Sequence, residues 1–170
     1  MPFLTESNIT LTFPDANGLR IANCNGYKAL SGFSFKEMDA CWYEQNSNTY
    51  WLFELKDFSS AALDKKSIEE RSWDIAKKAY DSLCFFLSSK NQYPFAVDID
   101  PCLPYVPDVN TEFKFVTIIH CDSSQRAGVQ LINEKFRNKF KPYAELFNIS
   151  YYAVVEHSRA IRMIPHGIVS

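Results

Sequence analysis

Residues 38–57 read MDACWYEQNSNTYWLFELKD, and this stretch decides how we expect the chain to fold. Two arms rich in aromatic residues, 38–43 and 50–56, flank the polar segment 45–49. Aromatic side chains favour strands, whereas Asn and Ser favour turns. The stretch therefore predicts a β-hairpin.

The second arm of this hairpin carries two charges that are two residues apart. Because side chains alternate between the faces of a strand, Glu54 and Lys56 share one face. The other face, which we expect to lie against the core, carries Trp51, Phe53 and Leu55. Charges in the middle of an apolar strand are unusual, since burial without a partner is costly. The pair therefore indicates a candidate functional face.

Asp39 on the first arm can join this pair in two registers. With a two-residue turn at 46–47, Asp39 lies opposite Glu54. With a four-residue turn at 46–49, it lies opposite Lys56. In both registers the three charges share one face, about 5 Å apart across the strands. A register shifted by one residue would move Asp39 to the opposite face.

Two neighbouring carboxylates repel each other unless a cation lies between them. Mg²⁺ or Mn²⁺ is suited to this role, because hard divalent ions take carboxylate and carbonyl oxygens and retain several waters. Such an ion lowers the pKa of a bound water and neutralises the charge that develops on a phosphate. A lysine beside it can orient or activate that water, or stabilise the phosphate.

Asp39 on one hairpin strand and Glu54-Leu55-Lys56 on the next resemble the signature of the PD-(D/E)xK nuclease superfamily. The resemblance implies a restriction-endonuclease-like fold and a metal-dependent phosphodiesterase that acts on DNA or RNA. It also implies that Asp39, Glu54 and the backbone carbonyl of Leu55 are metal ligands, and that Lys56 is the catalytic lysine. Met38 stands where the name of the superfamily has proline.

The rest of the chain predicts an alternation of strands and helices. Ser67 and Glu70 are spaced as a capping box, so we expect a helix that ends near Ser88. Pro94, Pro101, Pro104 and Pro107 exclude a helix from 91–110. The remaining expectations are strands over 8–13, 19–24, 113–120, 151–155 and 160–164, a turn at 25–26 rather than the N-terminal helix of the superfamily, and a second helix capped by Ser123 or Ser124 and broken or kinked by Pro142. This order predicts one α/β domain over 1–170, with a mixed central sheet flanked by helices.

The bulk composition gives no global signal for nucleic acid, because the net charge is −2. A phosphate-binding surface would have to be local. The expected second helix is locally basic, and phosphate neutralisation or an ordinary solvated face explains this equally simply. The candidate nucleic-acid-binding residues on it are Arg126, Lys135, Arg137, Lys139 and Lys141.

The N-terminal residues lack the basic start and apolar run of a secretion signal, and no stretch is long and apolar enough for a membrane span. The five cysteines show no Cys-x-x-Cys spacing, and Cys41, Cys84 and Cys121 lie inside apolar runs. We therefore expect buried free thiols in a cytoplasmic, reducing compartment and no membrane partner.

The sequence thus favours a nuclease with an Asp39, Glu54 and Lys56 site that uses Mg²⁺ or Mn²⁺. Its size favours a homodimer or the cutting subunit of a larger assembly. Two alternatives stay open: a non-catalytic binding or assembly protein on an α/β fold, and a small-molecule hydrolase that uses the same acids.

Overall fold

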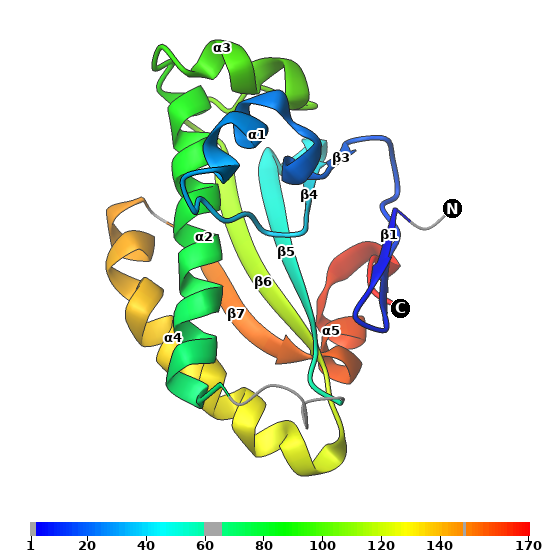
Figure 1. The fold of residues 1–170 in the computed structure, drawn as a ribbon. Coiled ribbons are helices and arrows are strands. Elements are labelled where there is room, and N and C mark those ends of the chain that lie inside the picture. Colours follow the sequence, from blue (N-terminus) through cyan, green and yellow to red (C-terminus); the bar gives the residue numbers. More distant parts are fainter. Residues whose placement is uncertain (1–2, 60–65, 148) are drawn as a thin grey trace.

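A mixed β-sheet forms the centre of the computed structural model, which describes residues 3–59, 66–147 and 149–170 (Figure 1). Strand β4 pairs antiparallel with β3 on one side and with β5 on the other. Strands β5, β6 and β7 run parallel to one another. The bounds along the sheet, in spatial order, are β3 (Gly18–Leu19), β4 (Ala40–Glu44), β5 (Thr49–Asp57), β6 (Glu112–His120) and β7 (Tyr151–Glu156). The predicted α/β class with a mixed sheet flanked by helices is confirmed.

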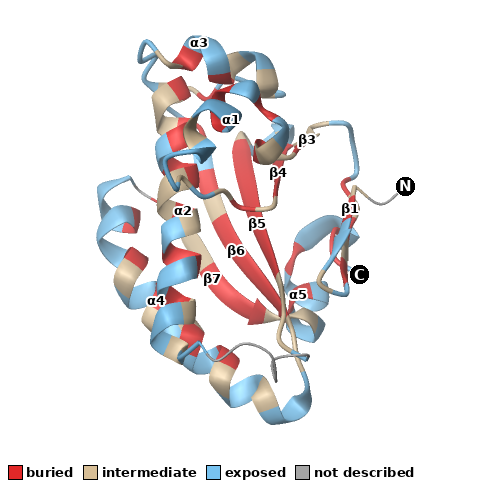
Figure 2. Ribbon diagram, viewed as in Figure 1, coloured by how far each residue is buried: buried red, intermediate tan, exposed pale blue. Residues whose placement is uncertain are grey.

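Both faces of this sheet are covered. Helices α2 (Ile68–Lys90) and α4 (Arg126–Leu146) lie on one face. Helix α5 (His157–Met163) and the small hairpin of β1 (Leu4–Glu6) and β2 (Ile9–Leu11) lie on the other. Strand β5 is consequently buried from Thr49 to Leu55, and Figure 2 shows it buried along most of its length.

Helix α2 begins where the sequence predicts. The Ser67 hydroxyl accepts a hydrogen bond from the Glu70 amide, and the Glu70 carboxylate accepts one from the Ser67 amide, which completes the capping box. The helix ends at Lys90, two residues beyond the expected Ser88. Its apolar side packs on the sheet through Ile75, Ala76, Ala79, Leu83 and Phe86.

Helix α4 departs from the prediction at its start, and Pro142 lies within it rather than at a break. Its first turn, the 3₁₀ segment Ser123–Gln125, is capped by Asp122 rather than by Ser123 or Ser124. Pro142 does not break the helix, which continues to Leu146. Proline removes one backbone hydrogen bond from a helix interior. The buried side chains of Phe140 and Ala144, on either side of Pro142, keep this last turn packed on the core.

Four other predicted segments are wrong. The expected strand over 160–164 lies in the last part of α5 and at its C-cap, where Ala160 and Ile164 are buried. The expected strand over 19–24 is largely a 3₁₀ turn, Ile21–Asn23, and the turn at 25–26 opens helix α1 (Asn25–Ser31). The proline-rich segment contains α3 (Ala96–Ile99) and the 3₁₀ turn Asp100–Cys102, because proline is tolerated in the first turn of a helix.

The cysteines also differ from the expectation of free, buried thiols. Cys24 and Cys102 form a disulfide between the start of α1 and the turn after α3. Gly26 permits this close approach, because a Cβ atom there would lie 2.8 Å from the Asp98 carbonyl oxygen. Among the free cysteines, Cys41 is buried, Cys84 is exposed and Cys121 is intermediate. A separation of 78 residues gives no local signal for the pairing.

None of the helices in the described ranges is long and apolar enough to cross a membrane.

Candidate functional site

The hairpin register brings the predicted acidic residues together. Ala40 pairs with Phe53 and Glu44 pairs with Thr49, so Asp39, one residue before β4, lies across from Glu54. This agrees with the first of the two registers that the sequence allows. The turn is closed by the 3₁₀ segment Gln45–Ser47 and by Asn48 in the left-handed conformation.

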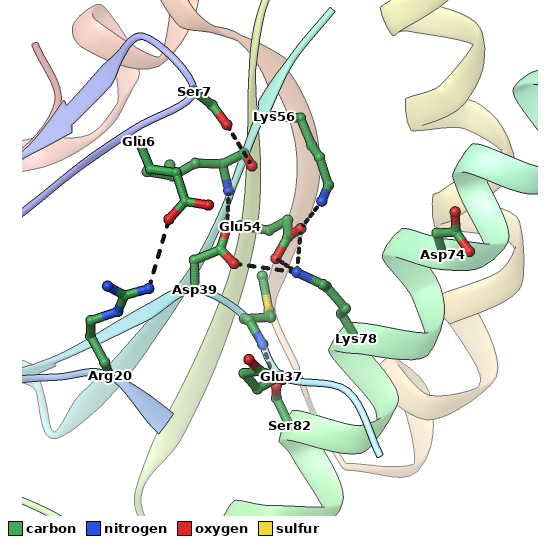
Figure 3. Close-up of polar contacts among 12 residues, drawn as sticks. Glu6, Ser7, Arg20, Glu37, Asp39, Glu54, Lys56, Asp74, Lys78 and Ser82 are labelled. Atoms are coloured by element: carbon green, nitrogen blue, oxygen red, sulfur yellow. Dashed lines mark hydrogen bonds and ion pairs between the residues drawn. The ribbon is translucent and has the colours of Figure 1, made fainter. Parts of the chain in front are cut away.

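Glu54 lies at the centre of a cluster of charges on the face that α2 covers (Figure 3). Its side chain is completely buried. The Lys56 ammonium lies 2.6 Å from Glu54 Oε1, and the Lys78 ammonium lies 2.7 Å from the same oxygen. Lys78 also donates a hydrogen bond of 2.8 Å to Glu54 Oε2. Two lysines from different elements therefore converge on one buried carboxylate.

Asp39 is held in place from both of its oxygens. Oδ2 accepts a hydrogen bond of 2.8 Å from the Leu55 amide, and Oδ1 lies 3.2 Å from Lys78 Nζ. Lys78 therefore bridges the two carboxylates, as Figure 3 shows. The Leu55 carbonyl accepts a longer hydrogen bond, 3.4 Å, from the Ser7 hydroxyl.

Burial and the neighbouring Asp39 carboxylate raise the pKa of Glu54 to about 7, although Lys56 and Lys78 act in the opposite direction. Burial alone would lower the pKa of Lys78, but Glu54 and Asp39 outweigh it and hold this pKa above its ordinary value. Near neutral pH, Lys78 therefore stays charged while Glu54 exchanges its proton.

Lys78 is the site residue whose role the sequence analysis misses. It lies on α2 one turn after the buried Ile75 and one turn before the buried Ser82, so its side chain emerges from the edge of the apolar stripe. The sequence does show that this lysine lies at the edge of the apolar face of the helix. Its partners are 24 and 39 residues away along the chain, and only the packing of α2 on the sheet identifies them.

The oxygen donors at this cluster fit a hard divalent cation in kind. Two carboxylates and one backbone carbonyl from Leu55 supply oxygens, and Mg²⁺ or Mn²⁺ completes its shell with water. Lys78 now supplies the positive charge between the carboxylates, so an ion would compete with its ammonium group. Within the described residues, no group of three or more His, Cys, Asp or Glu side chains could hold a metal.

A hollow of about 230 Å³ lies beside this cluster. Lys56 and Lys78, the two lysines that contact Glu54, both line it, with side chains that are 35% and 21% exposed. Its described lining residues are cationic apart from Asp74: Lys36, Lys56, Lys66, Lys77 and Lys78. Lys66 pairs with Asp74, and Lys77 pairs with Asp81, each at 2.6 Å. An anion entering the hollow would meet the Lys56 and Lys78 ammonium groups.

The basic residues predicted on the second helix contact several different partners within the chain. Lys135 and Lys139 both pair with Glu69 on α2, and these contacts lower the pKa of Glu69 to about 2. Arg137 turns toward β7, where its guanidinium lies 4.6 Å from the centroid of the Tyr152 ring. Arg126 pairs with Glu156 and Lys141 with Glu145. Each of the five predicted residues thus has a contact within the chain.

Thr117 is a further polar residue of the site that the sequence does not identify. It pairs in register with Glu54 on the neighbouring strand β6 and is buried. Its hydroxyl makes no hydrogen bond within the described residues.

The chain was compared with protein-family models, with curated proteins and with solved structures, and no match was found in any of the three.

Proposed function

We propose that this protein is a metal-dependent phosphodiesterase of the restriction-endonuclease type, which hydrolyses DNA or RNA. The observation that carries the proposal is the convergence of Asp39, Glu54 and Lys56 beside a hollow that Lys56 and other lysines line. The connectivity supports it too, because a helix follows the Glu54–Lys56 strand and returns the chain to a parallel neighbour, β6.

In this proposal Asp39, Glu54 and the Leu55 carbonyl hold Mg²⁺ or Mn²⁺, which supplies an activated water and neutralises charge on the phosphate. The Leu55 amide orients Asp39 through its hydrogen bond. Lys56, the more exposed of the two lysines, orients the water and stabilises the negative charge that develops on the phosphate. Lys78 neutralises the carboxylates and keeps them close together before the ion binds.

The first experiment measures cleavage of labelled single- and double-stranded DNA and RNA with Mn²⁺, Mg²⁺ or EDTA. We expect metal-dependent cleavage that Lys56→Met lowers about a hundredfold or more, because the variant loses electrostatic stabilisation at the phosphate. Lys28→Ala, an exposed lysine on α1, is the matched control and should retain full activity.

A second measurement separates ion binding from catalysis. Mn²⁺ should raise the midpoint of thermal unfolding, and Asp39→Asn or Glu54→Gln should remove that rise. Lys56→Met should retain it, because this residue does not hold the ion in the proposal. If the protein shows neither cleavage nor a Mn²⁺-dependent rise in the unfolding midpoint, then Asp39, Glu54, Lys56 and Lys78 form a structural ion-pair network. The alternative of a non-catalytic binding protein would then replace this proposal.

A further inference from the structure

The lysine-lined hollow continues into two others. A second hollow, of about 110 Å³, shares Lys56, Lys66 and Asp74 with it. A third, of about 230 Å³, shares Phe58 and Arg71 with the second. The three hollows are therefore neighbours that share lining side chains between the end of β5 and the first turns of α4, and we call this row of hollows the groove.

The chemistry changes along this groove. The first hollow is lined by lysines, which suit the phosphates of a nucleic acid. The third is lined mainly by apolar groups, with Gly128 at its wall and few charges. The apolar side chains that line it are Phe58, Ile68, Val129 and Ile132. A ligand that fills the whole groove must be an anion at one end and an apolar, flat or compact group at the other.

Phe58 and Arg71 lie where the two chemistries meet. The Arg71 guanidinium lies 4.3 Å from the centroid of the Phe58 ring, and its Nε donates a hydrogen bond to the Lys66 carbonyl. Aromatic rings and arginine planes are the surfaces on which unstacked bases dock. A base in the third hollow would lie beside this pair, with its phosphate toward Lys56 and Lys66.

We propose that this groove binds single-stranded nucleic acid, with one base in the apolar hollow and the adjoining phosphates among the lysines. The inference rests on the proposed function and specifies the form of its substrate. A base that is paired and stacked in a duplex cannot enter the hollow unless it is first extruded, and extrusion costs the free energy of unpairing and unstacking. The recessed position of the carboxylates points the same way, since Glu54 is fully buried and the Asp39 side chain is only 12% exposed.

A substitution at Gly128 can test this inference without disrupting the fold. A Cβ atom at this position meets no heavy atom within 4 Å, and the residue is helical, so a larger side chain should be tolerated there. Gly128→Leu should fill the apolar hollow, whereas Gly128→Ala adds a single methyl group. Gly32→Leu, at the end of α1, is the matched control, because its added Cβ also meets open space.

Binding is measured in EDTA, where no metal-dependent cleavage occurs, by the fluorescence anisotropy of labelled oligothymidylate, oligouridylate and a duplex of equal length. We expect both single strands to bind more tightly than the duplex, and Gly128→Leu to weaken single-strand binding about tenfold. Gly128→Ala and Gly32→Leu should bind as the wild type does. Lys77→Gln should lower the slope of log K against log salt by about 0.7.

Equal affinity for the duplex, or unchanged single-strand binding by a folded Gly128→Leu protein, would overturn the inference. If the wild type cleaves duplexes and Gly128→Leu cleaves them equally well, the inference is overturned while the proposed nuclease function stands. Selective single-strand binding without metal-dependent cleavage would support the groove and reject the nuclease. The two proposals therefore fail in different experiments.

Discussion

Lysines gather at two places in this molecule, and their surroundings differ. Around Glu54, Lys56 and Lys78 converge on a carboxylate that is completely buried. On α4, Lys135 and Lys139 pair with Glu69, whose side chain is 48% exposed. The carboxylate of the first group is poorly solvated, so charges interact strongly there, whereas water reaches the carboxylate of the second group and screens its ion pairs.

The comparison shows that a run of basic residues in a sequence does not indicate which lysines contact a buried carboxylate. The basic run on α4 is the more conspicuous in the sequence, yet its members Arg126, Lys135 and Lys141 form ion pairs with glutamates whose side chains are at least 20% exposed. Lys78 is flanked by ordinary helical residues, yet it bridges the two buried carboxylates. The free energy of unfolding should therefore respond very differently to changes at the two places.

The largest effect is expected at Lys78. Lys78→Met leaves Asp39 and Glu54 with Lys56 alone, so at pH 8 we expect the free energy of unfolding to fall by about 3 to 5 kcal/mol. The loss should be smaller at pH 5, because Glu54 is then protonated. Lys135→Met, at an exposed pair, should have little effect on the free energy of unfolding at either pH.

Urea-induced unfolding of both variants and the wild type at the two pH values provides the measurement. Similar losses for Lys78→Met and Lys135→Met would remove the distinction between the two groups of lysines.

The second effect concerns the pH dependence that Glu54 contributes. Its pKa is about 7 in the folded protein and about 4.5 when unfolded. Between these values the folded state binds the proton and the unfolded state does not, so stability falls as pH rises through this window. The total contribution is about 3 kcal/mol, and Glu54→Gln should abolish it. The difference in unfolding free energy between wild type and variant, measured in EDTA from pH 4 to 8, should change by that amount; a constant difference would contradict the raised pKa.

The smallest effect is expected at Glu69, and its dependence on pH has the opposite sign to that of Glu54. The hydrogen bonds from Lys135 and Lys139 lower its pKa to about 2. Its contribution to stability is therefore present above pH 4.5 and is lost as the pH falls toward 2. Glu69→Gln should unfold at similar denaturant concentrations to the wild type in acid and at slightly lower ones at pH 7. Added salt should weaken the difference at pH 7, because this pair is exposed. A difference that salt leaves unchanged would show that the pair is not screened by solvent.

Much of the fold follows from local patterns in the sequence. The aromatic arms predicted the β4–β5 hairpin, and the Ser67–Glu70 spacing predicted the start of α2. Asp39, Glu54 and Lys56 were expected together because alternation along paired strands is a short-range rule. Three of the segments that were wrong, 19–24, 25–26 and 160–164, are short, and in the last the apolar residues suit either a strand or one helical turn.

The sequence by itself determined which side chains of the hairpin share a face, since that depends on neighbours along two adjoining strands. Only the tertiary structure decided that Glu54 is buried beneath α2, that Lys78 joins it to Asp39, and that Cys24 meets Cys102. These contacts join residues that are 24 to 78 positions apart, and many packings of the same elements are compatible with the local pattern. The choice among them is made by burial of apolar surface over the whole core, a property that no single segment carries.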